Sequence, residues 1–373
     1  MTFETLGISK KAINQLTTMG ITDPTPVQQG VITKIMNGVD IIVQSNTGTG
    51  KTLAFLLPLL EKIESTSNHL QGLIIVPTRE LALQINDVTS SLAPLYHINH
   101  LAVYGGKKMT DQEKKLKSPT QFIVATPGRL LDLVDRGQVD LTTITHFVLD
   151  EADQLLLSGF KPEIERIILN IPGNRQTLFF SATMPPQIKK IAYRYTYQPE
   201  YFVASSQIKK NSKIVQEVVY TNDRQKFPAL QEVLLVDNPY MAIVFCRTKR
   251  RANELFEKFK KYRYHADVLH SDIPQNKRER LLKKFRAGDL QYLIATDVAA
   301  RGLDVNFITN IYNFDAPDSV ETYLHRIGRT GRAGEAGTSC TFVTEADEDL
   351  IFQLKKQKIS NIKERAVKIG RKG

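Results

Sequence analysis

The chain has 373 residues, 42% hydrophobic and 24% charged, which is the composition of a soluble globular protein long enough for two domains. Its longest apolar run, residues 53–60, is interrupted by Pro58 and is far shorter than the ~20 residues that span a bilayer. Its start lacks a basic-then-apolar signal pattern, so a membrane or secreted protein is disfavoured and we expect a cytoplasmic one.

Positive charge is concentrated in the second half of the chain. The net charge is +11, and residues 208–373 hold 31 Lys and Arg against 21 Asp and Glu. This distribution favours a polyanionic partner, although a solvated surface with a basic tail is the plainer alternative. The two cysteines, Cys246 and Cys340, lie in apolar strand-like runs, so we expect buried thiols rather than a disulfide or a metal site.

Short β-branched runs alternate with amphipathic segments along the whole chain, a pattern that predicts parallel α/β sheets. Helices in the first half are predicted over 80–92 and 162–169, and the polar stretch 204–213 is the best candidate for a linker. The strands predicted before that stretch are 40–44, 72–76, 101–104, 122–125, 146–150 and 177–181. The strands predicted after it are 242–246, 266–270, 292–296, 310–314 and 339–343.

The first strand leads into the turn Ser45-Asn46-Thr47-Gly48-Thr49-Gly50-Lys51-Thr52, which precedes an apolar helix start. Such a turn points backbone N–H groups and the positive end of a helix dipole at one spot, which suits a phosphate. Lys51 can reach the β- and γ-phosphates, and the Thr52 hydroxyl can ligate Mg²⁺. The turn matches G-x-x-x-x-G-K-[ST] except at Ser45, and Gly-Lys-Thr turns also occur as plain loops. The predicted nucleotide-binding residues of the turn are Thr47, Gly48, Thr49, Gly50, Lys51 and Thr52.

A cluster of acids, Asp150-Glu151-Ala152-Asp153, stands at the end of the strand predicted at 146–150. Ligands of parallel sheets bind beyond the carboxyl ends of the strands, and an Asp there that faces a phosphate-binding turn suits Mg²⁺. Glu151 could then orient or deprotonate an attacking water. An acidic helix start stabilised by the dipole explains the acids alone, but it explains their pairing with the turn less well. The second half has no Gly-Lys-[Ser/Thr] turn, so its task is not phosphate cradling.

Taken with these two features, the sequence resembles the bacterial type of DEAD-box ATP-dependent RNA helicases, superfamily-two enzymes with two RecA-like lobes. The family's other motifs follow in the family's order. They are Pro24-Thr25-Pro26-Val27-Gln28, Pro77-Thr78-Arg79-Glu80-Leu81-Ala82, Gly105-Gly106, Thr126-Pro127-Gly128-Arg129, Ser181-Ala182-Thr183, Val244-Phe245-Cys246-Arg247-Thr248, Gln275-Asn276-Lys277-Arg278, the run 295–304 and the run 325–332.

The resemblance implies an α/β fold of two tandem RecA-like lobes, each a mostly parallel sheet flanked by helices. We expect an ATP-binding lobe at 1–206, a linker at 207–213, a second lobe at 214–354 and a basic tail at 355–373. The implied enzyme hydrolyses ATP to ADP and phosphate when RNA stimulates it, and it locally unwinds short RNA duplexes. An ATP-gated RNA clamp or scaffold in a ribonucleoprotein complex is the alternative. A P-loop kinase or a transporter ATPase would leave the second-lobe motifs without a task.

The same resemblance assigns residues of the first lobe to ATP and Mg²⁺. Gln28 would read the adenine edge, and the Phe3 ring would stack on the base. Asp150 would hold Mg²⁺ together with Thr52, and Glu151 would activate the attacking water.

In the second lobe, the resemblance adds Gly302 and Asp304 to the nucleotide site, with Asp304 on the ribose hydroxyl. Arg329 and Arg332 are expected as arginine fingers, planar donors suited to charge on a transferring phosphoryl group. Lys51 is on the opposite lobe, so hydrolysis would require the lobes to close.

RNA contacts implied by the resemblance come from hydroxyls, amides and arginines, which suit sequence-independent contacts to the backbone. They are assigned to Thr78, Arg79, Gly106, Thr126, Arg129, Thr248, Arg278 and Thr296. Coupling of ATP to RNA is assigned to Asp153, Ser181, Thr183 and His325, although a lone His is more often structural. The choice of RNA over DNA rests on the resemblance, as do ribosome-assembly or RNA-decay proteins as candidate partners. No membrane partner is expected.

Overall fold

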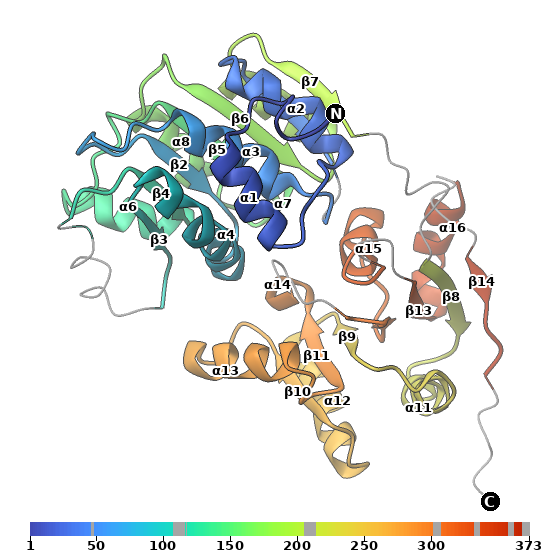
Figure 1. Cartoon of the computed structure of the whole chain (residues 1–373). Helices are drawn as coiled ribbons and strands as arrows, with labels where there is room; N and C mark the ends of the chain where they lie inside the picture. The colour runs from blue at the N-terminus through green and yellow to red at the C-terminus, as the bar shows by residue number, and fades with distance from the viewer. Residues whose placement is uncertain are drawn as a thin grey trace, which may run out of the picture. The chain divides into compact units, whose positions relative to one another are not determined.

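The computed structural model describes residues 1–45, 48–106, 116, 118–204, 214–300, 307–331, 336–356 and 362–367. The chain divides into two compact units, Met1–Ser206 and Gln207–Gly373, and the predicted linker 207–213 lies outside the described residues (Figure 1). Each unit is built on a parallel sheet of seven strands, which confirms the predicted fold class.

The first sheet has the strand order β3-β4-β2-β5-β6-β1-β7, with all neighbours parallel. Its strands are β1 (Ile41–Gln44), β2 (Gly72–Ile75), β3 (His100–Val103), β4 (Phe122–Ala125), β5 (His146–Leu149), β6 (Gln176–Ser181) and β7 (Glu200–Val203). The inner strands are almost entirely buried, as expected for a parallel sheet that helices cover on both faces.

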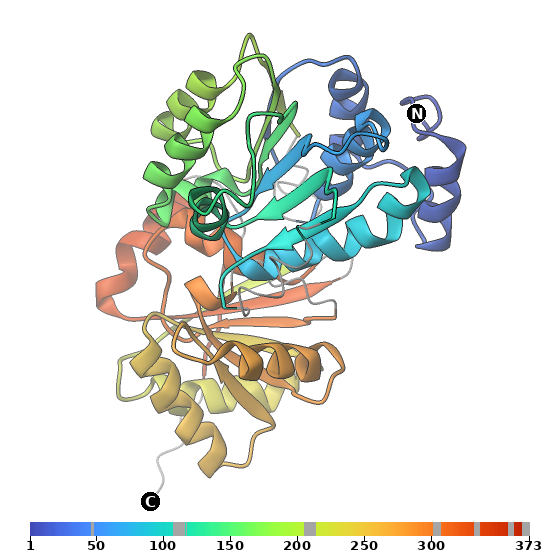
Figure 2. The ribbon, with the colours of Figure 1, turned by 90° about the vertical axis from the view of Figure 1, so that its left-hand side faces the viewer.

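Helices cover both faces of this sheet, as the view in Figure 2 shows. Successive strand residues point to opposite faces, so Val148 packs in one apolar cluster while Phe147 and Leu149 pack in the other. The first cluster lies under α1 (Lys10–Thr18), α2 (Pro26–Met36), α3 (Lys51–Lys62), α4 (Arg79–Leu92) and the 3₁₀ turn η1 (Ala93–Tyr96). The second lies under α6 (Pro127–Asp135), α7 (Ala152–Leu157), α8 (Lys161–Asn170) and α9 (Pro186–Tyr195).

The second sheet has the order β10-β11-β9-β12-β13-β8-β14, again with parallel neighbours. Its strands are β8 (Ile214–Tyr220), β9 (Ala242–Cys246), β10 (Ala266–Leu269), β11 (Tyr292–Thr296), β12 (Asn310–Asn313), β13 (Gly337–Val343) and β14 (Lys363–Glu364). Its helices are α11 (Lys226–Asp237), α12 (Lys249–Lys261), α13 (Gln275–Arg286), α14 (Asp297–Ala300), α15 (Val320–Ile327), the 3₁₀ turn η3 (Glu345–Asp347) and α16 (Glu348–Lys356). Cys246 and Cys340 are buried free thiols on β9 and β13.

Each of the predicted strands is present, and most of their bounds agree with the structure to within one residue. The helices predicted over 80–92 and 162–169 are α4 and α8. Three strands were not predicted: β7, β8 and β14. β7 and β14 lie at the ends of their sheets and keep exposed residues, so they lack the continuous apolar run that marked the others.

The segment 355–373, predicted as a basic tail, is in part built into the second unit. Its residues Lys363–Glu364 pair with β8 as β14, and Val367 packs against the core beneath α11 and α12. The Arg365 guanidinium lies 2.8 Å from a carboxylate oxygen of Glu217 and 2.7 Å from one of Asp237. Long-range contacts therefore tie residues 363–367 to the second unit. None of the helices in the described ranges combines the length and the hydrophobicity needed to span a bilayer.

Candidate functional site

Many of the predicted site residues of the first unit lie at or just after the end of a strand. They therefore lie at the carboxyl edge of the first sheet. Strands β3, β4 and β2 are neighbours, and the predicted RNA-contacting loops follow them. Strands β5, β6 and β1 are the next three, and the acids, the Ser181 turn and the phosphate-binding turn follow those. Because parallel strands end at one edge, the two sets of loops lie next to each other along it.

The phosphate-binding turn leads directly into helix α3. Gly48 and Gly50 have φ of +77° and +89°, and Gly50 is the N-cap of α3. The φ of Gly50 favours glycine, and a Cβ there would lie 2.6 Å from Nε2 of Gln28, so the Gln28 side chain would have to move. The buried Lys51 ammonium donates to the Ser45 carbonyl at 2.8 Å, inside the turn. Thr52 follows in the first turn of α3, whereas Thr47 lies outside the described residues.

Gln28 joins helix α2 to the phosphate-binding turn. Its Oε1 accepts from the Thr25 backbone N–H at 2.8 Å, and its Nε2 donates to the Gly50 carbonyl at 3.0 Å. Both ends of the amide are thus engaged within the protein, and an adenine would have to exchange these bonds. The Phe3 side chain is 2% exposed and packs in the core. The hydrogen bonds of Gln28 to the adenine edge and the stacking of Phe3 on the base both stay predictions.

Asp150 and Glu151 are buried where β5 ends. Burial raises the pKa of the Asp150 carboxyl to about 6, against the opposing effect of the Lys51 charge. Asp150 Oδ1 accepts from the Glu151 backbone N–H at 2.9 Å. Glu151 has a φ of +48°, uncommon for a residue with a side chain, and its buried Oε2 has no hydrogen-bond partner among the described residues. An unpaired buried carboxylate oxygen is costly and indicates a group held for a ligand or for catalysis.

Asp153, two residues after Glu151, is completely buried and is bonded to the loop after β6. Its Oδ2 accepts from the backbone N–H and from the hydroxyl of Thr183, each at 2.8 Å. The Ser181 hydroxyl accepts from the Asp153 backbone N–H at 3.2 Å and donates to the Thr183 carbonyl at 2.7 Å. The structure therefore brings three of the four predicted coupling residues into one network.

The predicted RNA contacts of the first unit also stand at structured positions. Thr78 is the N-cap of α4, where its hydroxyl accepts from the Leu81 N–H at 3.2 Å. The Arg79 guanidinium lies 4.4 Å from the ring centre of Tyr104 and donates to the Gly105 carbonyl at 2.8 Å. The other members of this set follow β3 and β4: Gly106, Thr126 at the N-cap of α6, and Arg129 in the first turn of α6.

In the second unit, the predicted RNA contacts follow the neighbouring strands β10, β11 and β9. Thr248 caps α12 and accepts from the Arg251 N–H at 3.2 Å. Arg278 lies in the first turn of α13 and donates to the Ala299 carbonyl at 2.6 Å, while Thr296 ends β11. As in the first unit, the residues assigned to the nucleotide reaction follow a different part of the sheet, because α15 and Arg329 follow β12.

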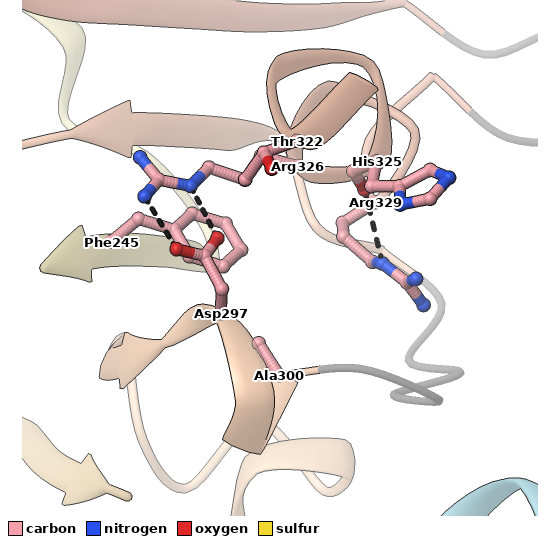
Figure 3. Close-up of a pocket in the computed structure, with 7 residues that line it drawn as sticks. All are labelled: Phe245, Asp297, Ala300, Thr322, His325, Arg326 and Arg329. Carbon is pink, nitrogen blue, oxygen red and sulfur yellow. Dashed lines mark hydrogen bonds and ion pairs between the residues drawn. The ribbon is translucent and has the colours of Figure 1, made fainter. Parts of the chain in front are cut away.

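Figure 3 shows a small pocket of the second unit that is lined in part by Arg326. No role was predicted for this buried arginine from the sequence. Arg326 is 2% exposed, and its guanidinium forms two bonds to the Asp297 carboxylate, at 2.6 and 2.7 Å. It also donates to Asn313 Oδ1 at 3.1 Å and to the Asp315 carbonyl at 2.7 Å. A single side chain thus fixes helix α15 to the ends of β11 and β12. The signal was present, because Arg326 lies inside the motif that supplied its neighbours.

His325 and Arg329, on either side of Arg326, line the same pocket, and Arg329 Nε donates to the His325 carbonyl at 3.3 Å. The Arg326 bonds therefore set the position of the helix that carries both residues. The remaining predicted residues of the second unit, Gly302, Asp304 and Arg332, lie outside the described residues.

Two RecA-like units, one with a phosphate-binding turn beside buried acids and one with buried arginines, define a nucleotide-dependent protein of the helicase type. The family model for the DEAD/DEAH box helicase matches residues 25–191, and the model for the helicase conserved C-terminal domain matches 225–334. This chain belongs to the DEAD-box ATP-dependent RNA helicases, a family of ATP-hydrolysing enzymes that act on RNA.

Curated relatives match over most of the chain. It is 42% identical over 367 residues to the DEAD-box ATP-dependent RNA helicase CshA of Bacillus subtilis, covering 98% of this chain and 74% of the relative. It is 44% identical over 341 residues to the ATP-dependent RNA helicase CshA of Listeria monocytogenes, covering 91% of this chain and 66% of the relative. The chain thus spans about two thirds to three quarters of the length of these relatives.

Solved structures of the same class resemble the whole chain. Dbp5 of S. cerevisiae, bound to RNA and ADP BeF3, has a TM-score of 0.89 at 28% identity and covers 98% of this chain and 95% of its own. Mss116 bound to single-stranded RNA and UDP-BeF has a TM-score of 0.87 at 27% identity and covers 99% and 81%. Both of these structures contain RNA and a nucleotide with a beryllium fluoride group.

Proposed function

We propose that this protein hydrolyses ATP in a reaction that RNA stimulates, and that it locally separates short RNA duplexes. The observation that carries the proposal is the order of the first sheet. The loops assigned to RNA follow β3, β4 and β2, those assigned to the nucleotide follow β5, β6 and β1, and all of them end at one edge. The Asp153–Thr183 hydrogen bonds join two loops of the nucleotide half, which supports a route by which one ligand influences the other.

For the nucleotide, we assign the triphosphate to the turn at 48–52 and to Lys51, which would exchange its bond to the Ser45 carbonyl for phosphate oxygens. Gln28 and Phe3 are assigned to the base. Thr47, together with Gly302 and Asp304 of the second unit, completes the proposed nucleotide-binding set.

Mg²⁺ would be held by the Thr52 hydroxyl and the Asp150 carboxylate, oxygen donors of the kind that this ion prefers. The burial that raises the pKa of Asp150 fits the assignment, because a cation beside this carboxylate would stabilise its charged form. When bound, the ion would neutralise charge on the phosphates.

Glu151 is proposed as the base that takes a proton from the attacking water. Its buried, unpaired Oε2 is an acceptor with no competing partner in the described part of the chain. The negative charge that grows on the phosphoryl group would be stabilised by Arg329 and Arg332.

For RNA, we assign backbone contacts with no sequence preference to hydroxyls, amides and arginines of both units. The proposed set is Thr78, Arg79, Gly106, Thr126, Arg129, Thr248, Arg278 and Thr296. His325 is proposed to join the Asp153 network in coupling. The proposed lobe limits, 1–206 and 214–354, are supported by the two compact units and by the family matches. We also propose a cytoplasmic location, where the two buried thiols would stay reduced.

Two assays on the full chain test this proposal: ATP hydrolysis with and without RNA, and release of a strand from a short RNA duplex. A helicase should show RNA-stimulated hydrolysis and ATP-dependent strand release. An RNA clamp should bind RNA in the presence of ATP without releasing strands, and a general ATPase should ignore RNA. Either of the last two results would overturn the proposal.

A further inference from the structure

Helix α13 carries a concentration of positive charge that the proposed function does not use. Its 12 residues, QNKRERLLKKFR, include six basic residues and one acidic residue. Arg278 is assigned to RNA above and is half-buried. The five exposed basic residues form a surface that we call the α13 basic surface, namely Lys277, Arg280, Lys283, Lys284 and Arg286.

Among the described residues, no acid forms an ion pair with the five charges of this surface. Helix α12 is the contrast, because Lys249 pairs with Asp272, Arg250 with Glu254, and Lys260 with Glu257. Unpaired cations on one helix face leave a positive potential that an anionic partner can use.

The fold fixes which way these side chains face. Leu281, Leu282 and Phe285 are buried against the second sheet and anchor the opposite side of the helix. Lys277, Arg280 and Lys284 are spaced i, i+3 and i+7, so they share one exposed stripe that rises ~1.5 Å per residue.

The plain alternative is that these charges are only solvated and compensate the helix dipole. That alternative accounts for only some of the five residues. Lys283, Lys284 and Arg286 lie towards the helix C-terminus, where positive charge is favourable. Lys277 stands in the first turn, where positive charge opposes the dipole and where no acid is present. Compensation of the helix dipole therefore does not account for the charge of Lys277.

We propose that the α13 basic surface binds the phosphate backbone of RNA that extends past the strand held by Arg278. The inference rests on the proposed function and deepens it, since Arg278 lies in the first turn of the same helix and the surface continues from it. Lysine and arginine contacts to phosphates add affinity without sequence preference and make binding depend on salt.

The test is the triple variant Arg280→Gln/Lys283→Gln/Lys284→Gln in the full chain. Affinity for oligouridylates of increasing length is measured with a non-hydrolysable ATP analogue over a series of KCl concentrations. Wild type should bind long RNA more tightly than short RNA, and the variant should lose this gain while it binds short RNA normally. On long RNA, the slope of log K against log salt should become shallower by up to ~0.7 per lost phosphate contact.

Two controls separate charge from folding. Arg280→Lys/Lys283→Arg/Lys284→Arg keeps the charges and should bind long RNA like wild type. Lys10→Gln/Lys190→Gln/Lys261→Gln removes three exposed charges elsewhere and should also leave the length dependence intact. The proposal is overturned if the first triple variant keeps the wild-type length dependence and salt slope, or if it weakens short and long RNA equally. Absence of RNA-stimulated hydrolysis in wild type would instead contradict the proposed function.

Discussion

The carboxylate of Asp153 accepts two hydrogen bonds from Thr183, one from the backbone N–H and one from the hydroxyl, each 2.8 Å long. Asp153 is completely buried and lies two residues after Glu151, while Thr183 lies in the loop after β6. Hydrogen bonds to a buried charge are stronger than neutral ones. We propose that these bonds pass a shift of Asp150 and Glu151 on nucleotide binding to the loop that holds Thr183.

Replacing the Thr183 hydroxyl should uncouple hydrolysis from strand separation. Thr183→Val removes one bond to the Asp153 charge, worth about 1.5–3 kcal/mol, and keeps the backbone bond and the shape of the side chain. We expect nearly normal ATP affinity but about tenfold fewer strands released per ATP hydrolysed. The measurement is strand release and phosphate release in the same reaction, with Thr183→Ser as the control that keeps the hydroxyl. An unchanged ratio in Thr183→Val would show that this bond does not transmit the signal.

Removing the proposed base should slow chemistry without weakening binding. Glu151→Gln keeps the shape of the side chain and replaces a buried, unpaired carboxylate oxygen. The chemical step should slow by about 10²–10⁴, and the variant should stay on single-stranded RNA while ATP is bound. Single-turnover hydrolysis and RNA dissociation with ATP present measure the two effects. Loss of ATP affinity, or RNA release as fast as in wild type, would assign Glu151 a different role.

His146 should make the protein less stable in mild acid. Burial, with a smaller contribution from Lys62, lowers the pKa of this imidazole from 6.5 to about 4. Between these two pH values the unfolded chain binds the proton and the folded chain does not, so stability falls as pH falls from about 6.5 to about 4. The loss is up to about 3 kcal/mol at the lower end. Urea unfolding of wild type and His146→Gln should show a smaller pH dependence for the variant, whereas parallel curves would contradict the prediction.

The ion pairs of Arg365 should stabilise the second unit. Arg365→Met leaves Glu217 and Asp237 without their cation, and we expect a loss of about 1–3 kcal/mol in the free energy of unfolding. Lys363→Met is the matched control, because Lys363 is an exposed residue of the same short strand. Far-UV circular dichroism is the suitable probe, since the chain has no Trp. Equal stability of the two variants would mean that the Arg365 pairs contribute nothing.

Local sequence signals account for much of the fold and for part of the site. The apolar runs identified the inner strands because burial on both faces demands continuous hydrophobic residues. The turn before Lys51 was predicted from its glycines and from the strand and helix on either side of it, and Gly48 and Gly50 do adopt a positive φ there.

Features that depend on distant contacts could not be predicted in this way. Strand order decides which loops are neighbours, and no local pattern encodes it. Lys363 and Glu364 have little intrinsic preference for a strand. They form one because they pair with the edge of β8 and because Arg365 bonds to Glu217, 148 residues away in the sequence. Arg326 would be expected at the surface by residue type, yet Asp297 and its other partners allow it to be buried.

The central claim is that ATP hydrolysis needs Arg329 of the second unit as well as Lys51 and Glu151 of the first. Single-turnover ATP hydrolysis at saturating RNA, compared between wild type and Arg329→Ala, tests it most directly. A planar cation that stabilises the transferring phosphoryl group is worth roughly 10³–10⁵ in rate, so hydrolysis should fall by that factor while binding of a fluorescent ATP analogue persists. Arg329→Lys should recover little, because lysine lacks the planar fork. Hydrolysis by Arg329→Ala at the wild-type rate would contradict the account.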